Sequence, residues 1–247
     1  MKGQPVTMQA RRATPIVRYA FSAIGRKVIM AVTGLALTLF LLLHMLGNLQ
    51  LFVGSESINR YAHFLHSNLE LLWPARIFLL LCLCLHIWSA VSLALENKRA
   101  RPVGYEGNPV PPGTTLAART MMYTGLAIAA FVIYHLLHFT VRAPAVNFAG
   151  QDFHALKEAL PWGEERADVY RMVALGFHQP VAVLIYLAGV GLLCFHLSHG
   201  LSAMFQSLGV RDRNWRGRLD RYAVWFSWLL FLGYAAVPAA VISGWVK

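Results

Sequence analysis

Five long apolar runs constrain the fold of this chain more than any other feature. They occupy about residues 28–53, 69–95, 121–141, 173–205 and 222–246. A membrane-spanning helix needs roughly 20 consecutive, mainly apolar residues, and each run is long enough. Only 13% of the 247 residues are charged, whereas soluble domains carry about 25%. We therefore predict an all-α integral membrane protein with five transmembrane helices, organised as a basic segment, 1–27, followed by a single membrane domain, 28–247.

Basic residues are concentrated on one side of the predicted membrane. Of the 22 Lys and Arg residues, most lie before the first run, between the second and third, or between the fourth and fifth: Lys2, Arg11, Arg12, Arg18, Arg26, Lys27, Lys98, Arg99, Arg101, Arg119, Arg211, Arg213, Arg216, Arg218 and Arg221. Such a bias marks the cytoplasmic side, so we predict a cytoplasmic N-terminus and an external C-terminus. The net charge of +11 is explained by orientation and lipid headgroups, and we expect no nucleic-acid partner.

The connecting segments differ in composition. Residues 55–72 are predicted to be partly helical at the outer surface, and the acidic loop 142–171 to form a short helix on the membrane. The Pro- and Gly-rich loop 97–119 is predicted to be irregular. Pro180 and Pro238 fall inside the fourth and fifth runs, where prolines are tolerated and usually mark kinks.

A repeated segment carries two of the intramembrane histidines. TGLALTLFLLLH, from Thr33 to His44, and TGLAIAAFVIYH, from Thr124 to His135, share the TGLA start, a phenylalanine and the final histidine. A second, shorter repeat, LCLH and LCFH, ends at His86 in the second run and at His196 in the fourth. Histidine is costly in lipid and usually functional there, so one matched histidine in each of four helices indicates a shared ligand.

The direction of each helix sorts these histidines into two levels. With a rise of about 1.5 Å per residue, His44 and His135 lie roughly 14 and 9 Å from the outer ends of their runs. His86 and His196 lie about 14 Å from the inner ends of theirs. This sorting predicts an outer pair, His44 with His135, and an inner pair, His86 with His196.

Two stacked haems, each held by two histidines, would satisfy both pairs. Glycines that would give a flat macrocycle room are equally typical of close helix packing: Gly34, Gly47, Gly125, Gly189, Gly191 and Gly200. An interhelical hydrogen bond or a proton relay is the alternative role for any single histidine. Histidines spaced i,i+3 could also chelate zinc, although His138 and His199 more plausibly hydrogen-bond haem or a neighbouring helix. Cys82, Cys84 and Cys194 form no C-x-x-C-H sequence, which excludes covalent haem attachment.

Several segments together resemble a known family over nearly the whole chain. They are SAIGRKVIMAVTGL (22–35), HMLGNL (44–49), LHIWSA (85–90) leading into NKRARP (97–102), TGL…YH (124–135) and, most specific, FHLSHGLSAMFQSLG (195–209). They resemble the di-haem cytochrome b membrane anchor of succinate:quinone oxidoreductases, the single-chain five-helix type. The resemblance implies that the first four helices form a haem-binding bundle. It also implies that His44 and His135 ligate the distal haem iron, and His86 and His196 the proximal one.

The resemblance also implies partners and a location. A flavoprotein subunit and an iron–sulfur subunit would dock on the cytoplasmic face of a prokaryotic cytoplasmic membrane. The two non-covalent b haems would pass electrons to or from a quinone, either menaquinone or ubiquinone, in succinate dehydrogenase or fumarate reductase. The chain itself would hold no flavin, no iron–sulfur cluster and no dicarboxylate site.

Residues for the quinone site are less specific. Ser22 and Arg26 match a quinone-contacting S-x-x-x-R pair in related four-helix anchors, although a basic helix start explains them equally well. On the outer side, His63 and Glu70 could exchange protons with a quinol. Cys194 stands where some family members carry an acidic residue for proton transfer, so a transmembrane proton path through that position is not expected.

Two other classes remain open from the sequence. The chain could be the cytochrome b subunit of another quinone-linked oxidoreductase, of the nitrate reductase, hydrogenase or formate dehydrogenase type. It could also be a haem-free transporter or proton channel that uses its intramembrane histidines. The segments GRKVIMAVTGL (25–35) and FHLSHGL (195–201) favour the succinate dehydrogenase type.

Overall fold

The computed structural model describes residues 19–100 and 114–247 and contains five helices long and apolar enough to cross a membrane. These are α2 (Ala23–Leu49), α4 (Leu69–Arg99), α6 (Met121–His135), α8 (Pro180–Ser207) and α9 (Arg216–Ile242). The turn η1 (Gln50–Phe52) extends α2, and a single π-helical turn, η2 (Leu136–Thr140), extends α6. The prediction of an all-α protein with five membrane-spanning helices is confirmed at this level.

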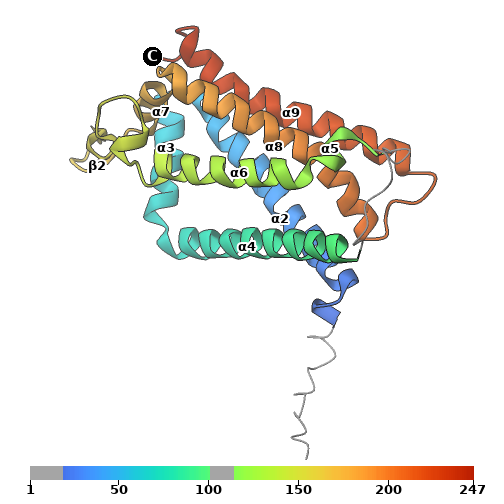
Figure 1. The fold of residues 1–247 in the computed structure, drawn as a ribbon. Helices are drawn as coiled ribbons and strands as arrows, with labels where there is room; N and C mark the ends of the chain where they lie inside the picture. The colour runs from blue at the N-terminus through green and yellow to red at the C-terminus, as the bar shows by residue number, and fades with distance from the viewer. Residues whose placement is uncertain (1–18, 101–113) are drawn as a thin grey trace, which may run out of the picture.

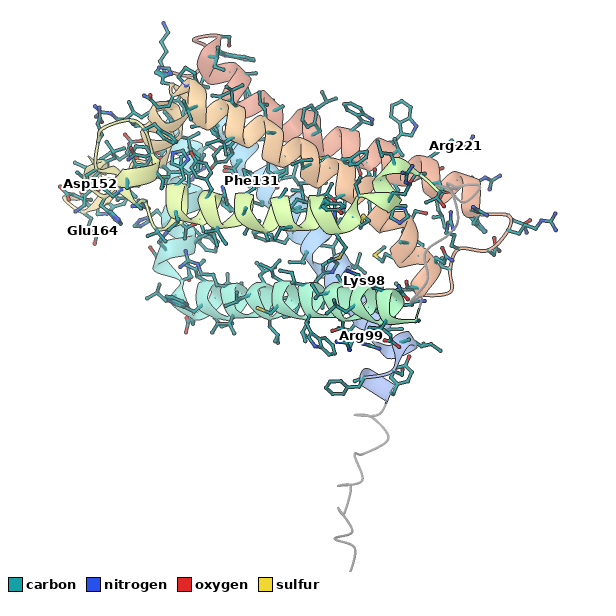
Figure 2. The ribbon with its side chains drawn as sticks, in the orientation of Figure 1. Lys98, Arg99, Phe131, Asp152, Glu164 and Arg221 are labelled. Carbon is teal, nitrogen blue, oxygen red and sulfur yellow. The ribbon has the colours of Figure 1, made fainter. Side chains whose placement is uncertain are left out.

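The two ends of the helix bundle differ in chemistry (Figures 1 and 2). One end, here called the basic end, gathers the start of α2, the end of α4, the short helix α5 (Leu116–Arg119), the end of α8 and the start of α9. Lys98, Arg99 and Arg221 lie there, whereas Asp152 and Glu164 lie at the opposite end. That opposite end, the cap end, is formed by α3 (Ser55–Ser67), η3 (Pro144–Val146), η4 (Phe153–Ala155), β1 (Lys157–Ala159), β2 (Glu165–Ala167) and α7 (Val169–Phe177).

The core lies around α8 and α2. Helix α8 packs against α6, α9 and α2, while α2 also packs against α4 and α9. Small residues allow the closest approaches: a side chain at Gly189 would overlap the ring of Phe131, and one at Gly233 would overlap Met45. Such small residues let membrane helices pack through van der Waals contact.

The fourth apolar run is divided into two helices, so the prediction of one kinked helix was wrong. Helix α7 ends at Phe177, and α8 begins at Pro180. Proline is favoured in the first turn of a helix because its missing N–H would be unpaired there anyway. Pro180 therefore starts a helix, whereas Pro238 lies inside α9, as expected, and Pro74 inside α4.

Two loop predictions were also wrong. The acidic loop forms an antiparallel hairpin of β1 and β2, with Lys157 opposite Ala167, in place of a short helix. The loop 97–119 is helical at both edges, because α4 continues to Arg99 and Thr115 caps α5 by accepting a hydrogen bond from the Ala118 amide at 3.1 Å. The middle of that loop and most of the basic N-terminal segment lie outside the described residues. The outer helix predicted within 55–72 is confirmed as α3.

A buried polar cluster holds the cap end together. Asn59 of α3 has no exposed surface, and its amide donates to Glu158 Oε1 at 3.0 Å and to Asp168 Oδ1 at 3.1 Å. The side-chain oxygen of Asn59, Oδ1, accepts a hydrogen bond from the Tyr170 backbone amide at 2.8 Å. Arg166, also buried, forms ion pairs with Glu56 and Glu158. Buried polar groups of this kind need partners, and here the partners join α3, the hairpin and α7.

Candidate functional site

The structure brings His44 and His135 together near the cap end of the bundle. Their ring centroids are 5.7 Å apart, and the ring planes are nearly perpendicular at 78°. His44 comes from the last turns of α2, and His135 is the last residue of α6. The phenylalanine of each repeat packs on the histidine one turn later: Phe40 stacks on His44 at 5.3 Å, and Phe131 lies 6.3 Å from His135.

His86 and His196 form a second pair nearer the basic end. His86 Nδ1 lies 3.1 Å from the Met30 carbonyl oxygen and 3.4 Å from Thr33 Oγ1. His196 Nδ1 lies 3.0 Å from Thr124 Oγ1. Ring contact thus joins His44 and His135, whereas His86 and His196 are each described by their contacts with α2 and α6.

The ring nitrogens of three of these histidines are used in the same way. Nδ1 of His86 and of His196 has the partners named above, and Nδ1 of His135 lies 3.0 Å from the hydroxyl of Tyr186. Within the described part of the chain, Nε2 of these three rings has no hydrogen bond. Metal-bound histidines usually have this arrangement, because a partner on one nitrogen fixes the ring for ligation through the other. His44 differs, since the Asn48 amide lies 3.5 Å from its Nδ1 and 3.4 Å from its Nε2.

These residues fit a haem better than a metal ion bound by protein alone. Two iron–nitrogen bonds of ~2 Å in line would place the ring centroids roughly 6 Å apart, close to the spacing of His44 and His135. All four rings are only part-buried although they lie within the helix bundle. In residues 19–100 and 114–247, no group of three or more His, Cys, Asp or Glu could hold a metal ion. His44 and His135 would supply two axial nitrogens, and a bound haem would need no more from the protein.

His138 occupies an unusual position that the sequence does not reveal. It lies in the π-helical turn η2, is fully buried, and stacks on Phe139 at 4.0 Å and on Phe153 at 5.9 Å. Neither ring nitrogen has a hydrogen-bond partner among the described residues. The expected bond to a neighbouring helix is therefore absent there. A π turn of this kind often marks a functional position.

Of the quinone candidates, Ser22 and Arg26 lie together and already have structural roles. Ser22 Oγ accepts from the Gly25 amide at 3.0 Å and so caps α2. Arg26 forms an ion pair with Glu96 at the end of α4, and its Nε lies 3.4 Å from the Ser22 carbonyl oxygen. This arrangement corresponds to the basic helix start that the sequence left open.

His63 and Glu70 lie on different helices at the cap end. His63 Nε2 lies 3.4 Å from the hydroxyl of Ser67 in its own helix, α3. Glu70 is exposed in the first turn of α4. No hydrogen bond or ion pair joins the two side chains in the part of the chain that the structure describes.

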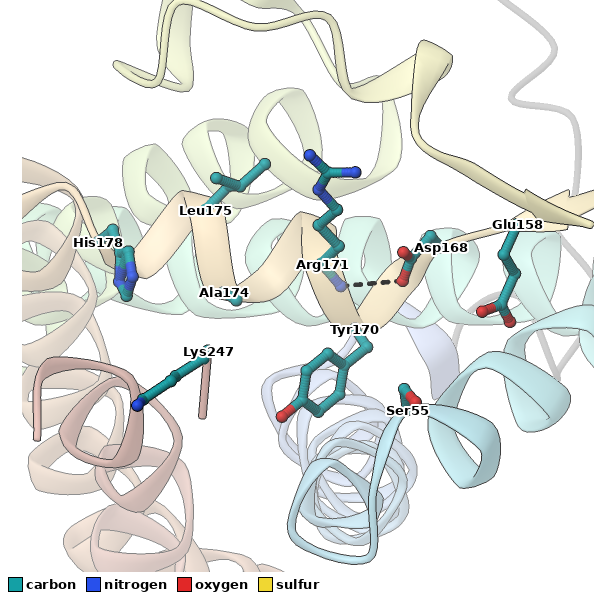
Figure 3. Close-up of a pocket in the computed structure, with 9 residues that line it drawn as sticks. All are labelled: Ser55, Glu158, Asp168, Tyr170, Arg171, Ala174, Leu175, His178 and Lys247. Atoms are coloured by element: carbon teal, nitrogen blue, oxygen red, sulfur yellow. Dashed lines mark hydrogen bonds between the residues drawn. The ribbon is translucent and has the colours of Figure 1, made fainter. Parts of the chain in front are cut away.

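A cavity of about 350 Å³ lies at the cap end, away from the histidine pairs. It is lined by Ser55, Glu158, Asp168, Tyr170, Arg171, Ala174, Leu175, His178 and Lys247. Figure 3 shows the Arg171 amide donating to Asp168, which caps α7. Because carboxylates and basic side chains both line it, the cavity suits a small polar solute or water better than an apolar ligand.

The structure adds Thr33, Thr124 and Tyr186 to the residues that sequence reasoning singled out. The signal for the two threonines was present, since both open the TGLA repeat. Comparisons with protein-family models, with curated proteins and with solved structures found no match. The class that the fold itself defines is a multi-pass helical membrane protein with five spanning helices.

Proposed function

We propose that this chain is the di-haem cytochrome b membrane anchor of a succinate:quinone oxidoreductase, acting as succinate dehydrogenase or fumarate reductase. It would conduct electrons between an iron–sulfur subunit and a membrane quinone. The observation that carries the proposal is the contact between His44 of α2 and His135 of α6, together with His86 and His196 on two further helices nearer the basic end. Bound haem would supply a one-electron carrier at each level.

The protein's part is to hold the imidazoles and to exclude water. His44 and His135 would ligate the haem at the cap end, and His86 and His196 the haem at the basic end. Hydrogen bonds at Nδ1 of His86, His135 and His196 keep Nε2 free, and second partners of this kind raise ligand basicity. The apolar helices around them lower the local dielectric, which helps to set the reduction potentials.

The basic end is the proposed docking face for the iron–sulfur subunit, and through it for the flavoprotein subunit. Exposed basic side chains from α4, α5 and α9 gather there: Lys98, Arg99, Arg119, Arg216, Arg218 and Arg221. Arg26 and Arg211 instead pair with Glu96 and Asp220. The positive-inside bias supports a cytoplasmic position for this end, and in a prokaryote such a membrane would be the cytoplasmic one. The quinone would be menaquinone or ubiquinone.

An absorption spectrum tests the haem assignment directly. Purified protein reduced with dithionite should show a b-type α band and contain two haems per chain. His44→Ala and His86→Ala should each remove about half of the haem, because each disrupts one pair. The matched control is His66→Ala, since His66 is an exposed histidine of α3. A colourless wild-type protein would rule out the proposal in favour of a haem-free transporter.

Co-purification separates the proposal from other quinone-linked oxidoreductases. A flavin-bearing partner with an iron–sulfur subunit supports the succinate dehydrogenase type. A molybdenum or nickel protein in its place would contradict it. Replacing Arg216, Arg218 and Arg221 by Ala should weaken the complex, and the difference from the wild type should be largest at low salt, because high salt already screens exposed charges.

A further inference from the structure

The threonine and glycine that open each repeat contact a histidine of another helix. Thr33 and Gly34 in α2 lie against His86 of α4, and Thr124 and Gly125 in α6 lie against His196 of α8. Each repeat therefore carries its own histidine at the cap-end pair and touches a histidine of the basic-end pair. The proposed haem ligation uses only the last residue of each repeat and gives no role to its start.

The hydroxyl of each threonine has a carbonyl acceptor in its own helix, which leaves a lone pair available to the histidine. Thr33 Oγ1 donates its hydrogen to the Ile29 carbonyl at 2.7 Å, and Thr124 Oγ1 donates to the Thr120 carbonyl at 3.1 Å. A hydroxyl has one hydrogen and two lone pairs, so the remaining contact is with a lone pair. With the hydroxyl hydrogen on its own helix, Nδ1 of His196 would carry the proton that the hydroxyl accepts, in the arrangement that the Met30 carbonyl imposes on His86.

At His86 the tautomer is determined more strictly. The Met30 carbonyl oxygen, 3.1 Å from Nδ1, can only accept a hydrogen bond. Nδ1 of His86 therefore carries the proton, and the lone pair of the neutral ring lies on Nε2. Thr33 Oγ1, at 3.4 Å, is a weaker second acceptor.

Gly34 allows the His86 ring to lie close against the helix backbone, whereas a Cβ atom at Gly125 would make only ordinary contact with His196. A Cβ atom at Gly34 would stand 3.2 Å from His86 Cε1, and one at Gly125 would stand 3.6 Å from His196 Cε1. The two threonines are equally buried, each with 6% of its surface exposed. The same contact thus occurs twice, on two helices.

From this geometry we infer that Thr33-Gly34 and Thr124-Gly125 are positioning residues for the basic-end pair. Each Thr–Gly pair holds Nδ1–H of the neighbouring histidine and directs Nε2 toward the ligand that both histidines share. The inference rests on the proposed function for the identity of that ligand as haem. The contacts of both rings, and the tautomer of His86, follow from the protein alone.

The experiment compares Thr124→Val with Thr124→Ser, and includes Thr33→Val. Valine keeps the shape of threonine and removes the acceptor, whereas serine keeps the hydroxyl. Thr38→Val is the matched control, because Thr38 is also 6% exposed and also donates to its own helix, at Gly34 O, but contacts no histidine. Redox titration of the two haems is the measurement.

Loss of the acceptor makes the imidazole a poorer donor to Fe(III), so one of the two midpoint potentials should rise in Thr124→Val. A neutral hydrogen bond changes an equilibrium by up to about tenfold, which for a one-electron couple is 59 mV. The rise should be smaller in Thr33→Val, because the Met30 carbonyl still holds His86. The other potential should stay constant in every variant, and serine should restore the wild-type value.

Two results would overturn the inference. In wild-type protein that binds two haems, unchanged potentials in Thr124→Val would do so, and so would an equal shift in Thr38→Val. If the wild type binds no haem, the proposed function fails, and the positioning role is tested in the same preparation by ¹⁵N NMR of the histidine rings. The Nδ1–H tautomer of His196 should then be lost in Thr124→Val only; a ring unaffected by the substitution would refute the inference.

Discussion

Asn59 is the residue through which α3, the hairpin and α7 are joined, so its removal should open the cap end. Asn59→Ala deletes three hydrogen bonds, two to the carboxylates of Glu158 and Asp168 and one from the Tyr170 amide. Hydrogen bonds contribute about 1 kcal/mol each and more when one partner is charged. The sum is reduced because Asp168 keeps its bond to the Arg171 amide and because part-exposed Glu158 can be hydrated.

The expected loss is about 2–4 kcal/mol of cap stability, which is roughly a 30- to 1,000-fold larger population of open cap. Native-state hydrogen exchange measures such local opening without unfolding the membrane helices. The Tyr170 amide should exchange faster by that factor, and the amides of β1 and β2 should follow it.

Asn147→Ala is the matched control for this prediction. Asn147 is equally buried, but its hydrogen bonds are local, to the Gln151 carbonyl at 2.7 Å and from the Ala149 amide at 2.9 Å. It should accelerate exchange near residues 147–151 only. If Asn59→Ala changes exchange at Tyr170 less than about threefold, or no more than the control does, Asn59 does not hold the cap and the reasoning is refuted.

Three further predictions follow from the same structure. Tyr186→Phe removes the hydroxyl 3.0 Å from His135 Nδ1, so in haem-loaded protein it should move the potential that Thr124→Val leaves constant; a shift of the same potential by both variants would contradict the two-level arrangement. The pKa of Glu56 is lowered, first of all by its hydrogen bond with Arg166. The stability that Glu56 contributes is therefore present above its unfolded pKa and should be lost as the pH falls below about 4. Hydrogen exchange of the cap end measures this loss, and Arg166→Gln should abolish the pH dependence. His138→Leu removes a fully buried ring whose nitrogens have no partner in the described residues. Thermal denaturation should show unchanged or higher stability, because an unpaired buried polar group costs about 1–3 kcal/mol. A clear loss of stability would contradict this and would mean that His138 makes a polar contact to a bound group.

The sequence predicts the breaks between helices and the structure of the loops less well than it predicts the spanning helices. The polar residues His178 and Gln179 precede Pro180 inside the fourth apolar run, and a hydropathy average over a whole span does not resolve so short an interruption. In the acidic loop, Arg166 pairs with Glu158 in the same hairpin and with Glu56, which is distant in sequence. Contacts between distant residues of this kind decide loop structure and leave no periodic signal.

Some features of the candidate site can also be predicted from the sequence, and others cannot. Helix direction and spacing predict the level of His135, because a straight helix converts sequence separation into depth, whereas the levels predicted for His44 and His86 rest also on the matched sequence segments. The phenylalanine in each repeat is also readable, since it precedes its histidine by one turn of the same helix. Ser22 and Arg26, by contrast, could not be separated from a simple helix start by sequence.

The sequence by itself therefore determined the membrane class and the five helices, because hydrophobicity is a local property of the chain. Only the tertiary structure decided which atoms surround each ring. The Met30 carbonyl and the hydroxyls of Thr33 and Thr124 reach histidines on other helices, and helix packing alone sets those approaches. For that reason the start of the repeat could be seen in the sequence, while its contact with the second histidine pair could be seen only in the fold.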